Sequence, residues 1–263
     1  MVSFRKPKKD MPMNERFERI LDILLKEKKI SVGELSSRLG VSEVTIRKDL
    51  TELENQGRLL RRYGGAIPAE NPQQVVSHLK RISQQQDEKH RIAKFAASLI
   101  NDGENILLDA GSTILALARE LHGRELRVVT NNLAVASELL PDEKVIVELI
   151  GGTLRKASGA LVGPWACRAL ETIRVDKVFL GCSGFDLKLG FSSENAVEAE
   201  TKQKMLNCAP EIIVLADHTK FTRPAFANFA RPDQISSIIT DKKLPEDISR
   251  NLRKSKIKIN FVP

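Results

Sequence analysis

Polar side chains follow the apolar runs in the second part of this 263-residue chain. Glycine and hydroxyl groups at the start of a helix suit a phosphate, because the N–H groups there attract anions. One apolar run ends in Asp109 and leads into Gly-Ser-Thr at residues 111–113, although a turn glycine with an ordinary helix cap has the same pattern. The residues that we predict to contact a small-molecule ligand are Asp109, Gly111, Ser112, Thr113, Thr130, Asn131, Gly151, Gly152, Ser183, Gly184, Asp186 and Lys220.

Polar residues follow five of the predicted strands in this part of the chain, at residues 109–113, 130–132, 151–152, 183–186 and 217–220. Five such strand ends in one domain favour a shared pocket over five unrelated turns. Lys220 would supply a positive charge to an anionic ligand. His218, two residues earlier, is expected either to face solvent or to influence which ligand is chosen. The sequence therefore predicts an anion-binding pocket at these strand ends.

A second set of residues, near the N-terminus, suits DNA. Short polar and cationic side chains lie between residues 42 and 48, where Thr and Arg can contact base edges and phosphates in the major groove. Arginines then precede a Tyr-Gly-Gly turn and can hold backbone phosphates. The residues that we predict to contact DNA are Ser42, Thr45, Arg47, Lys48, Arg58, Arg61, Arg62 and Tyr63.

The positive charge is concentrated in the same region. Residues 1–80 hold 16 basic and 11 acidic side chains, a net charge of +5, whereas residues 81–263 hold 26 and 23, a net charge of +3. A basic segment can attract phosphate backbones, although charge alone favours an ordinary solvated surface.

Helical and hairpin patterns position the DNA-binding candidates in a first domain, expected at residues 13–68. Apolar spacing predicts three helices within residues 14–56, with caps at Ser31 and Ser42 and a stop at Gly40. The expected buried stripe of the third helix consists of Ile46, Leu50 and Leu53. Two β-prone runs around the Tyr-Gly-Gly turn predict a wing, which completes a winged helix-turn-helix.

The rest of the chain alternates between strand and helix patterns. Residues 69–86 are expected to form a linker and residues 87–260 a larger domain. Apolar runs separated by helical patterns imply a mostly parallel sheet with helices on both faces, where ligands bind beyond the carboxyl ends of the strands. The expected strands are 105–109, 126–130, 145–150, 177–181, 212–216 and 237–240, with a final helix and edge strand near the C-terminus.

The first domain closely resembles the DeoR family of bacterial transcriptional regulators. The resemblance rests on Val-Ser-x-x-Thr-Ile-Arg-Lys-Asp-Leu at residues 41–50 and Arg-x-x-Gly-Gly-Ala at residues 61–66. The family more often has Arg where this chain has Lys48, a change that keeps the charge but removes bidentate geometry. The resemblance implies an α/β chain, with a winged helix-turn-helix followed by a larger, mostly parallel sensor domain resembling ribose-5-phosphate isomerase.

The second domain resembles the DeoR-type sensor domain through Leu-Asp-Ala-Gly-Ser-Thr at residues 108–113, Thr-Asn-Asn at 130–132 and Gly-Gly-Thr-Leu at 151–154. This resemblance implies a phosphorylated sugar or related metabolite as effector. It also implies a repressor of a carbohydrate-utilisation operon that binds a double-stranded DNA operator, as a homodimer or homotetramer in the bacterial cytoplasm. The family often has Ser-Ser where His218 and Thr219 stand here.

Two other classes of protein compete with this interpretation. A sugar-phosphate isomerase needs a carboxylate base and a second group that handles charge on oxygen. The isomerases that the domain resembles have two acids in one turn, where this chain has only Asp186, and Glu194 and Glu198 are expected on a helix surface. A structural nucleoid protein would bind DNA without needing polar strand ends. A regulator without enzymatic activity is therefore favoured.

Composition excludes several other classes. A membrane-spanning helix needs roughly 20 apolar residues, and no run in the chain approaches that length, nor does an apolar segment follow the basic N-terminus. The three cysteines, Cys167, Cys182 and Cys208, form no Cys-x-x-Cys pair, so we expect a reducing compartment, no metal and no cofactor. Trp165, the sole tryptophan, is expected to pack in the interior.

Overall fold

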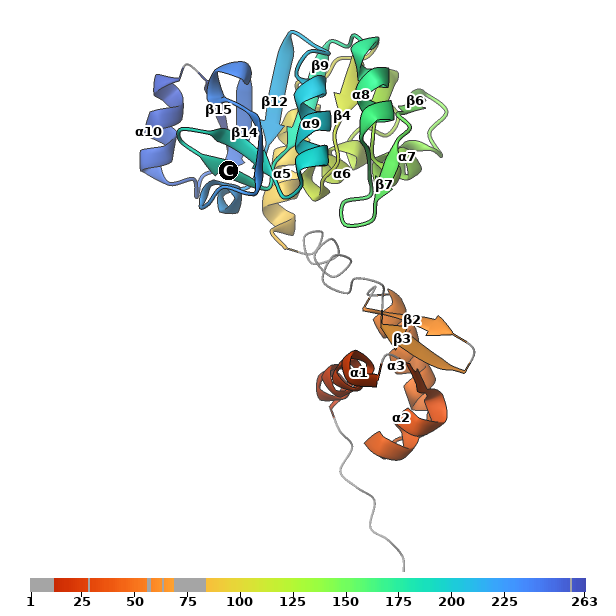
Figure 1. The fold of residues 1–263 in the computed structure, drawn as a ribbon. Coiled ribbons are helices and arrows are strands. Elements are labelled where there is room, and N and C mark those ends of the chain that lie inside the picture. The colour runs from red at the N-terminus through yellow and green to blue at the C-terminus, as the bar shows by residue number, and fades with distance from the viewer. Residues whose placement is uncertain (1–11, 28, 56–57, 63, 69–83, 256) are drawn as a thin grey trace, which may run out of the picture. The chain divides into compact units, whose positions relative to one another are not determined.

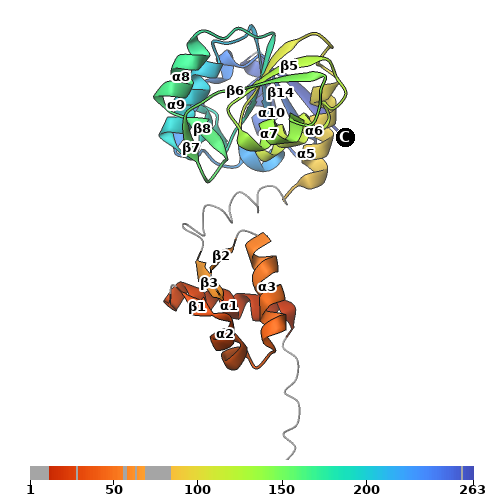
Figure 2. The same ribbon diagram turned by 90° about the vertical axis from the view of Figure 1, so that its right-hand side faces the viewer.

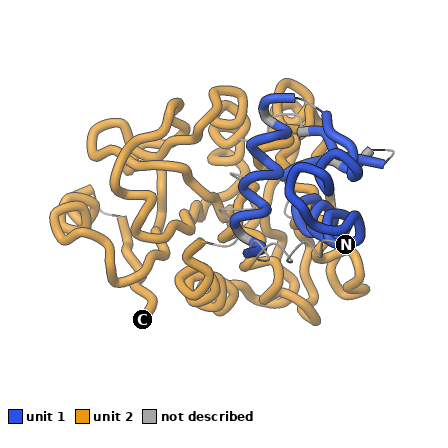
Figure 3. Tube along the Cα trace, turned by 90° about the horizontal axis from the view of Figure 1, so that it is seen from below, with its two compact units in different colours: residues 1–80 blue, residues 81–263 orange. Residues whose placement is uncertain are grey.

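A computed structural model of the chain describes residues 12–27, 29–55, 58–62, 64–68, 84–255 and 257–263. The protein divides into two compact units, residues 1–80 and residues 81–263 (Figure 3). The division falls inside the predicted linker. Residues 69–83 of that linker lie outside the described part of the chain.

The described part of the first unit consists of three helices and a small antiparallel sheet (Figure 1). Its elements are α1 (Met13–Glu27), β1 (Ile30–Ser31), α2 (Val32–Leu39), α3 (Glu43–Asn55), β2 (Leu59–Arg62) and β3 (Gly65–Pro68). A short turn joins α2 to α3, and β2 pairs with β3 as a hairpin, so the predicted winged helix-turn-helix is confirmed. The core contains the fully buried side chains Ile20, Leu35, Ile46, Leu50 and Leu53.

Local sequence signals set both ends of α2. Ser31 is the N-cap, and its hydroxyl accepts the N–H of Glu34 at 3.2 Å. The Glu34 carboxylate accepts the N–H of Ser31 at 2.9 Å, which completes a capping box. Gly40 ends the helix with φ +68°, a conformation that favours glycine. The predicted cap and stop are both confirmed.

The strand β1 was not predicted, because two residues carry no pattern that a sequence could show. Ile30 pairs with Ala66 and Ser31 pairs with Gly65, so β1 adds a third strand to the wing sheet. A Cβ atom at Gly65 would lie 2.2 Å from the carbonyl oxygen of Ile30. Only glycine permits this approach, and the turn glycine therefore ties the wing to the segment that precedes α2.

A seven-stranded sheet forms the centre of the second unit (Figure 1). In spatial order its strands are β15 (Lys258–Val262), β14 (Ser237–Asp241), β12 (Glu211–Leu215), β9 (Lys177–Gly181), β4 (Asn105–Leu108), β5 (Leu126–Thr130) and β6 (Val145–Leu149). All neighbouring strands are parallel. The predicted strands and the expected edge strand are confirmed, and with them the mostly parallel α/β class.

Helices cover both faces of this sheet (Figure 2). One face packs against α5 (Gln86–Ala97), α6 (Ser112–Arg119) and α7 (Leu133–Leu139), and the other against α8 (Pro164–Glu171), α9 (Ala196–Met205) and α10 (Glu246–Lys254). Successive side chains of β9 point to opposite faces, so Phe179 packs with the first set and Val178 and Leu180 with the second. None of the described helices combines the length and the apolar character that crossing a bilayer requires.

The strand order reverses beside β4. From this strand, β5 and β6 follow on one side, whereas β9 and all later strands of the sheet lie on the other side. In open parallel sheets, ligands bind outside the carboxyl ends of the strands at such a reversal. The ends of β4 and β9 are therefore the first place to look for a ligand site.

Two smaller antiparallel sheets were not predicted. One is the hairpin of β7 (Thr153–Arg155) and β8 (Ala160–Val162), and the other joins β10 (Gly184–Asp186), β11 (Gly190–Ser193) and β13 (Ala227–Ala230). Strands of three or four residues offer too few positions for a clear alternation. The expectation for Trp165 was also wrong, since this side chain at the start of α8 is 76% exposed.

Candidate functional site

The outer face of α3 carries two of the residues predicted to enter the major groove. Arg47 and Lys48 are exposed there, while Ile46 and Leu50 face the core. The Arg47 guanidinium lies 2.6 Å from the carboxylate of Glu43, one turn earlier, and both side chains are about half exposed. A shallow hollow on this face is lined by Val44, Arg47, Lys48, Thr51 and Glu52.

Ser42 and Thr45 are engaged with each other at the start of α3. The Ser42 hydroxyl accepts the N–H of Thr45 at 3.2 Å, and the two hydroxyl oxygens are 2.9 Å apart. This bond supports the predicted capping role of Ser42. Ser42 is exposed and Thr45 is half-buried, so a contact of either residue with DNA stays a prediction.

The arginines near the wing differ in what they contact. Arg61 donates to the hydroxyl of Thr51 at 2.8 Å and therefore lies beside α3. Arg58 instead lies 2.8 Å from the carboxylate of Glu18, so it is held against α1. Two further predicted contacts lie outside the described part of the molecule, namely the side chain of Arg62 and the whole of Tyr63.

Sequence reasoning missed an ion pair that fixes α3 against α1. The Arg16 guanidinium contacts the Asp49 carboxylate through Nε at 2.5 Å and Nη2 at 2.9 Å. Asp49 is only 4% exposed, because it lies three residues after Ile46 on the inner side of the helix. An acid at that position requires a cationic partner, and this was the available signal.

A buried ion pair joins three elements at the reversal between β4 and β9. Lys202 of α9 contacts the carboxylate of Asp109, which follows β4, and donates to the carbonyl oxygen of Gly181 at 2.9 Å. The N–H of Gly181 donates to the same carboxylate at 3.0 Å. Asp109 is 0% exposed and Lys202 is 2% exposed. The Asp109 carboxylate therefore holds Lys202 and the end of β9, while its Oδ1 has no hydrogen-bond partner among the described residues, and its contact with a ligand stays a prediction.

Lys202 itself was missed by the sequence analysis. It lies on the inner face of α9, between the buried residues Ala199 and Met205. A lysine at an apolar helix position implies a buried acid elsewhere in the chain, but the sequence could not identify which acid.

The start of α6 contains the predicted phosphate-binding segment. Gly111 is the N-cap with φ +151°, and it supplies no side-chain hydrogen bond to the first turn. Ser112 is half-buried and Thr113 is 7% exposed. Since an α-helix leaves its first N–H groups without intrahelical partners, the start of α6 offers donors to an anion.

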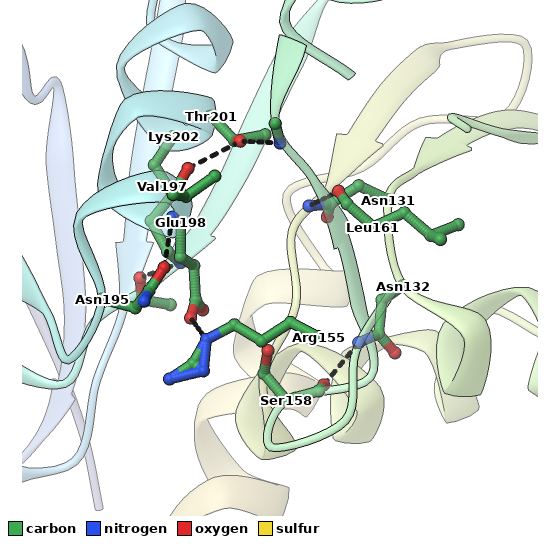
Figure 4. Close-up of polar contacts among 12 residues, drawn as sticks. Asn131, Asn132, Arg155, Ser158, Leu161, Asn195, Val197, Glu198, Thr201 and Lys202 are labelled. Carbon is green, nitrogen blue, oxygen red and sulfur yellow. Dashed lines mark hydrogen bonds and ion pairs between the residues drawn. The ribbon is translucent and has the colours of Figure 1, made fainter. Parts of the chain in front are cut away.

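The amides that follow β5 hold the β7–β8 hairpin (Figure 4). Asn131 donates through Nδ2 to the carbonyl oxygen of Leu161 at 3.1 Å, and Asn132 donates to that of Ser158 at 2.9 Å. Asn131 is 1% exposed, and its Oδ1 has no hydrogen-bond partner among the described residues. Thr130 is fully buried, and its hydroxyl accepts the N–H of Asn132 at 3.1 Å; its contact with a ligand stays a prediction.

The same hairpin is tied to α9 by an ion pair (Figure 4). Arg155 Nε lies 3.2 Å from the carboxylate of Glu198, and the two side chains are 18% and 12% exposed. The expectation that Glu198 lies on a helix surface is therefore wrong. A Cβ at Gly152 would lie 2.8 Å from the carbonyl oxygen of Val162, so this glycine permits the hairpin to return, whereas Gly151 has no neighbour within 4 Å.

Gly184 and Asp186 build the β10–β11 hairpin. A Cβ at Gly184 would lie 2.4 Å from the carbonyl oxygen of Arg223, which leaves no room for a side chain. The Asp186 carboxylate accepts the N–H groups of Leu189 and Lys188, and these bonds hold its pKa below the ordinary value. Gly184 is therefore enclosed and Asp186 stabilises a turn, and a ligand contact of either residue stays a prediction.

Cys182 lies among charged groups at the end of β9. Burial raises the pKa of its thiol to about 12, although the positive charges of Lys220 and Lys202 act in the opposite direction. The thiol is therefore neutral at physiological pH. Lys220 is half-buried, and its contact with a ligand stays a prediction. Ser183, the next residue, is also half-buried.

His218 faces a buried carboxylate. Its ring Nδ1 lies 2.9 Å from the Asp241 carboxylate, and its backbone N–H donates to the same carboxylate at 2.8 Å. Burial raises the pKa of Asp241, but the hydrogen bonds from His218 outweigh this effect, so the pKa lies below the ordinary value. The His218 side chain is 21% exposed, so it is enclosed rather than free in solvent.

Comparison with known proteins defines the class of this protein. A family model described as "DeoR-like helix-turn-helix domain" matches residues 16–71, and one described as "DeoR C terminal sensor domain" matches residues 84–242. These matches and the relatives below identify a helix-turn-helix transcriptional regulator rather than an enzyme. The chain belongs to the DeoR family.

The relatives span nearly the whole chain. The chain is 36% identical over 253 residues to "Uncharacterized HTH-type transcriptional regulator YulB" of Bacillus subtilis, covering 96% of this chain and 98% of that protein. It is 34% identical over 241 residues to the "Lactose phosphotransferase system repressor" of Staphylococcus aureus, covering 90% of this chain and 96% of that protein. Among solved structures, ribose 5-phosphate isomerase A of Methanocaldococcus jannaschii is 19% identical to this chain, with a TM-score of 0.39. The alignment covers 53% of this chain and 56% of the isomerase, and the similarity concerns the fold alone.

Proposed function

We propose that this protein represses a carbohydrate-utilisation operon in the bacterial cytoplasm, and that a phosphorylated sugar or related metabolite changes its affinity for operator DNA. The proposal that an effector binds rests on the start of α6, where no side chain caps the first N–H groups. The same unit also contains the buried Asn131 Oδ1, which has no hydrogen-bond partner among the described residues. The staphylococcal relative, a lactose phosphotransferase system repressor, supports a link to carbohydrate use.

The proposed DNA interface is the outer face of α3. Arg47 and Lys48 would face base edges and phosphates, and Arg61, which contacts α3 through Thr51, would hold the backbone beside the groove. Arg47 must exchange its contact with Glu43 for the DNA. This exchange has a small cost, because an ion pair between exposed side chains is worth only about 0.2–1 kcal/mol.

One such unit buries too little DNA surface for a specific site. We therefore infer that the protein binds as a homodimer or homotetramer and reads repeated half-sites about one helical turn apart.

The proposed effector site lies at the carboxyl ends of β4, β5 and β9. The N–H groups at the start of α6, together with the hydroxyls of Ser112 and Thr113, would bind the phosphate. Lys220 would balance its charge, and the Asn131 oxygen would accept a hydrogen bond from a sugar hydroxyl. The buried ion pair of Asp109 and Lys202 would stabilise the strand ends that carry these groups.

The effector must bind the DNA-competent and DNA-incompetent forms unequally, because equal affinity shifts no equilibrium. A coupling free energy of about 1–3 kcal/mol would change operator affinity by roughly 5- to 150-fold. Release of the operator and tighter binding to it are both effector responses of this kind.

Thermal shift and gel shift together test the proposal. The wild-type protein is heated with ribose 5-phosphate, glucose 6-phosphate, fructose 6-phosphate and galactose 6-phosphate, with the unphosphorylated sugars as controls. We expect at least one phosphate ester to raise the melting temperature and to alter the gel shift on the protein's own promoter region.

Ser112→Asp places a negative charge where the phosphate would bind, so this variant should lose the ligand response while it still binds the promoter. Ser98→Asp, at an exposed serine of the same unit, is the matched control and should respond as the wild type does. Ligand responses of equal size in Ser112→Asp and the wild type would overturn the effector site. Failure of the wild type to bind the promoter at low salt would overturn the DNA interface.

A further inference from the structure

The outer face of α3 carries one large apolar side chain among its charged and polar ones. Val44 is 61% exposed, whereas the helix's other large apolar residues, Ile46, Leu50 and Leu53, are 0% exposed. Val44 therefore contributes little to the core of the first unit. Its exposure has to be explained by what the surface contacts.

Val44 lies among the residues of the proposed DNA interface. Arg47, Lys48 and Thr51 follow it at three, four and seven residues, a spacing that places all four on one side of the helix. The same residues line the shallow hollow of this face, together with Glu52. Val44 is also in the first turn of α3, and the first residues of a recognition helix are those that approach base edges.

The chemistry of the major groove leaves few partners for this side chain. Base edges there present hydrogen-bond donors and acceptors, and the apolar group that they offer is the 5-methyl group of thymine. A valine pressed against a donor or acceptor would remove water from it without replacing the hydrogen bond. A valine against the methyl group buries apolar surface on both sides.

We propose that Val44 reads thymine in the operator, by packing against its 5-methyl group. Each half-site then contains a thymine at the position that Val44 faces. The inference rests on the proposed function, because it takes the outer face of α3 as the surface that binds DNA. The positive charges of Arg47 and Lys48 on the same face favour DNA as the occupant over a second copy of this cationic surface.

The test removes the methyl group from the DNA and the methyl groups from the protein. Footprinting of the full-length protein on its own promoter region first defines the protected sequence. Each thymine in one half-site is then replaced in turn by deoxyuridine, which lacks only the 5-methyl group. Affinities of the wild type and of Val44→Ala are measured for every substituted duplex.

We expect one thymine at which deoxyuridine weakens wild-type binding by about fourfold, the factor that corresponds to one buried methyl group. Val44→Ala should bind the unsubstituted operator more weakly and should be insensitive to deoxyuridine at that position. Val44→Thr, which keeps one methyl group, should retain part of the effect. Leu140→Ala, at a 79% exposed leucine of the second unit, is the matched control and should behave as the wild type.

The outcomes separate this inference from the function on which it rests. A protected operator at which deoxyuridine affects the wild type and Val44→Ala equally at every position would overturn the thymine contact and leave the DNA interface intact. The absence of any protected sequence would overturn both. Thermal melting of Val44→Ala shows whether the variant is folded, and the exposure of Val44 predicts an unchanged melting temperature.

Discussion

The two units of this protein present their candidate residues in opposite ways. In the first unit Arg47 and Lys48 lie on the outside of a single helix and are exposed. In the second unit Asp109, Asn131 and Lys202 come from segments far apart in the sequence and are almost completely buried. One exposed helix can contact a DNA duplex, whereas a small ligand has to be surrounded by groups that only the tertiary fold brings together.

Two ion pairs, one from each unit, show the same difference. The pair of Arg47 and Glu43 is half exposed and joins neighbouring turns of one helix, so it can open when DNA arrives. The pair of Lys202 and Asp109 is buried and joins α9 to the end of β4, so opening it would leave a charge without water. Substitutions in these two pairs should therefore change DNA binding for Arg47 and folding for Lys202.

The largest expected effect is that of Lys202→Met. This variant leaves the Asp109 carboxylate buried without its cation, which should lower the free energy of unfolding of the second unit by about 3–5 kcal/mol. Urea unfolding followed by circular dichroism measures the loss. The double variant Lys202→Met with Asp109→Asn removes both charges and should recover most of the stability. A single variant as stable as the wild type would contradict the structural role of the pair.

A smaller effect, confined to binding, is expected from Arg47→Ala. The side chain is exposed, so the melting temperature should stay unchanged, while operator affinity should fall by about 1–3 kcal/mol if Arg47 contacts a base. Fluorescence anisotropy with operator and random DNA measures the two affinities. Arg250→Ala, at a 68% exposed arginine of the second unit, is the control. An equal loss on both DNAs would show that Arg47 contacts only phosphate.

The smallest expected effect concerns acid and the second unit. The pKa of Asp241 is lowered in the folded protein, so its contact with His218 stabilises the fold above the ordinary pKa of the carboxyl group. That stabilisation should disappear as the pH falls through the lowered pKa. Melting temperatures between pH 6 and pH 3 should therefore fall less steeply in Asp241→Asn than in the wild type. Parallel curves would show that this carboxylate contributes nothing to acid sensitivity.

Most of the first unit could be predicted from its sequence because its signals are local. The Ser31 capping box, the stop at Gly40 and the buried stripe of α3 each depend on residues within one or two helical turns. Arg16 and Asp49 were missed because they are 33 residues apart, and no short pattern links them.

The second unit was predictable in its strands but less so in its site. Continuous apolar runs identified the parallel strands, and the polar residues at their ends lie at the carboxyl edge of the sheet, where we propose the effector site. Thr130, Gly184 and Asp186 share that edge, but in the structure they stabilise turns and hairpins and do not line an open surface. Residue type and position could not distinguish these two uses.

The sequence by itself determined the helices, the strands of the seven-stranded sheet and the outward placing of the basic residues on α3. Hydrophobic spacing and helix caps were sufficient for these, because each depends on the backbone conformation of a few neighbouring residues. The tertiary structure alone decided that Lys202 meets Asp109, that Arg155 meets Glu198 and that the Asn131 oxygen is left without a partner. The two ion pairs join residues that are 43 and 93 positions apart, and only the packing of helices on the sheet determines which side chains face one another there.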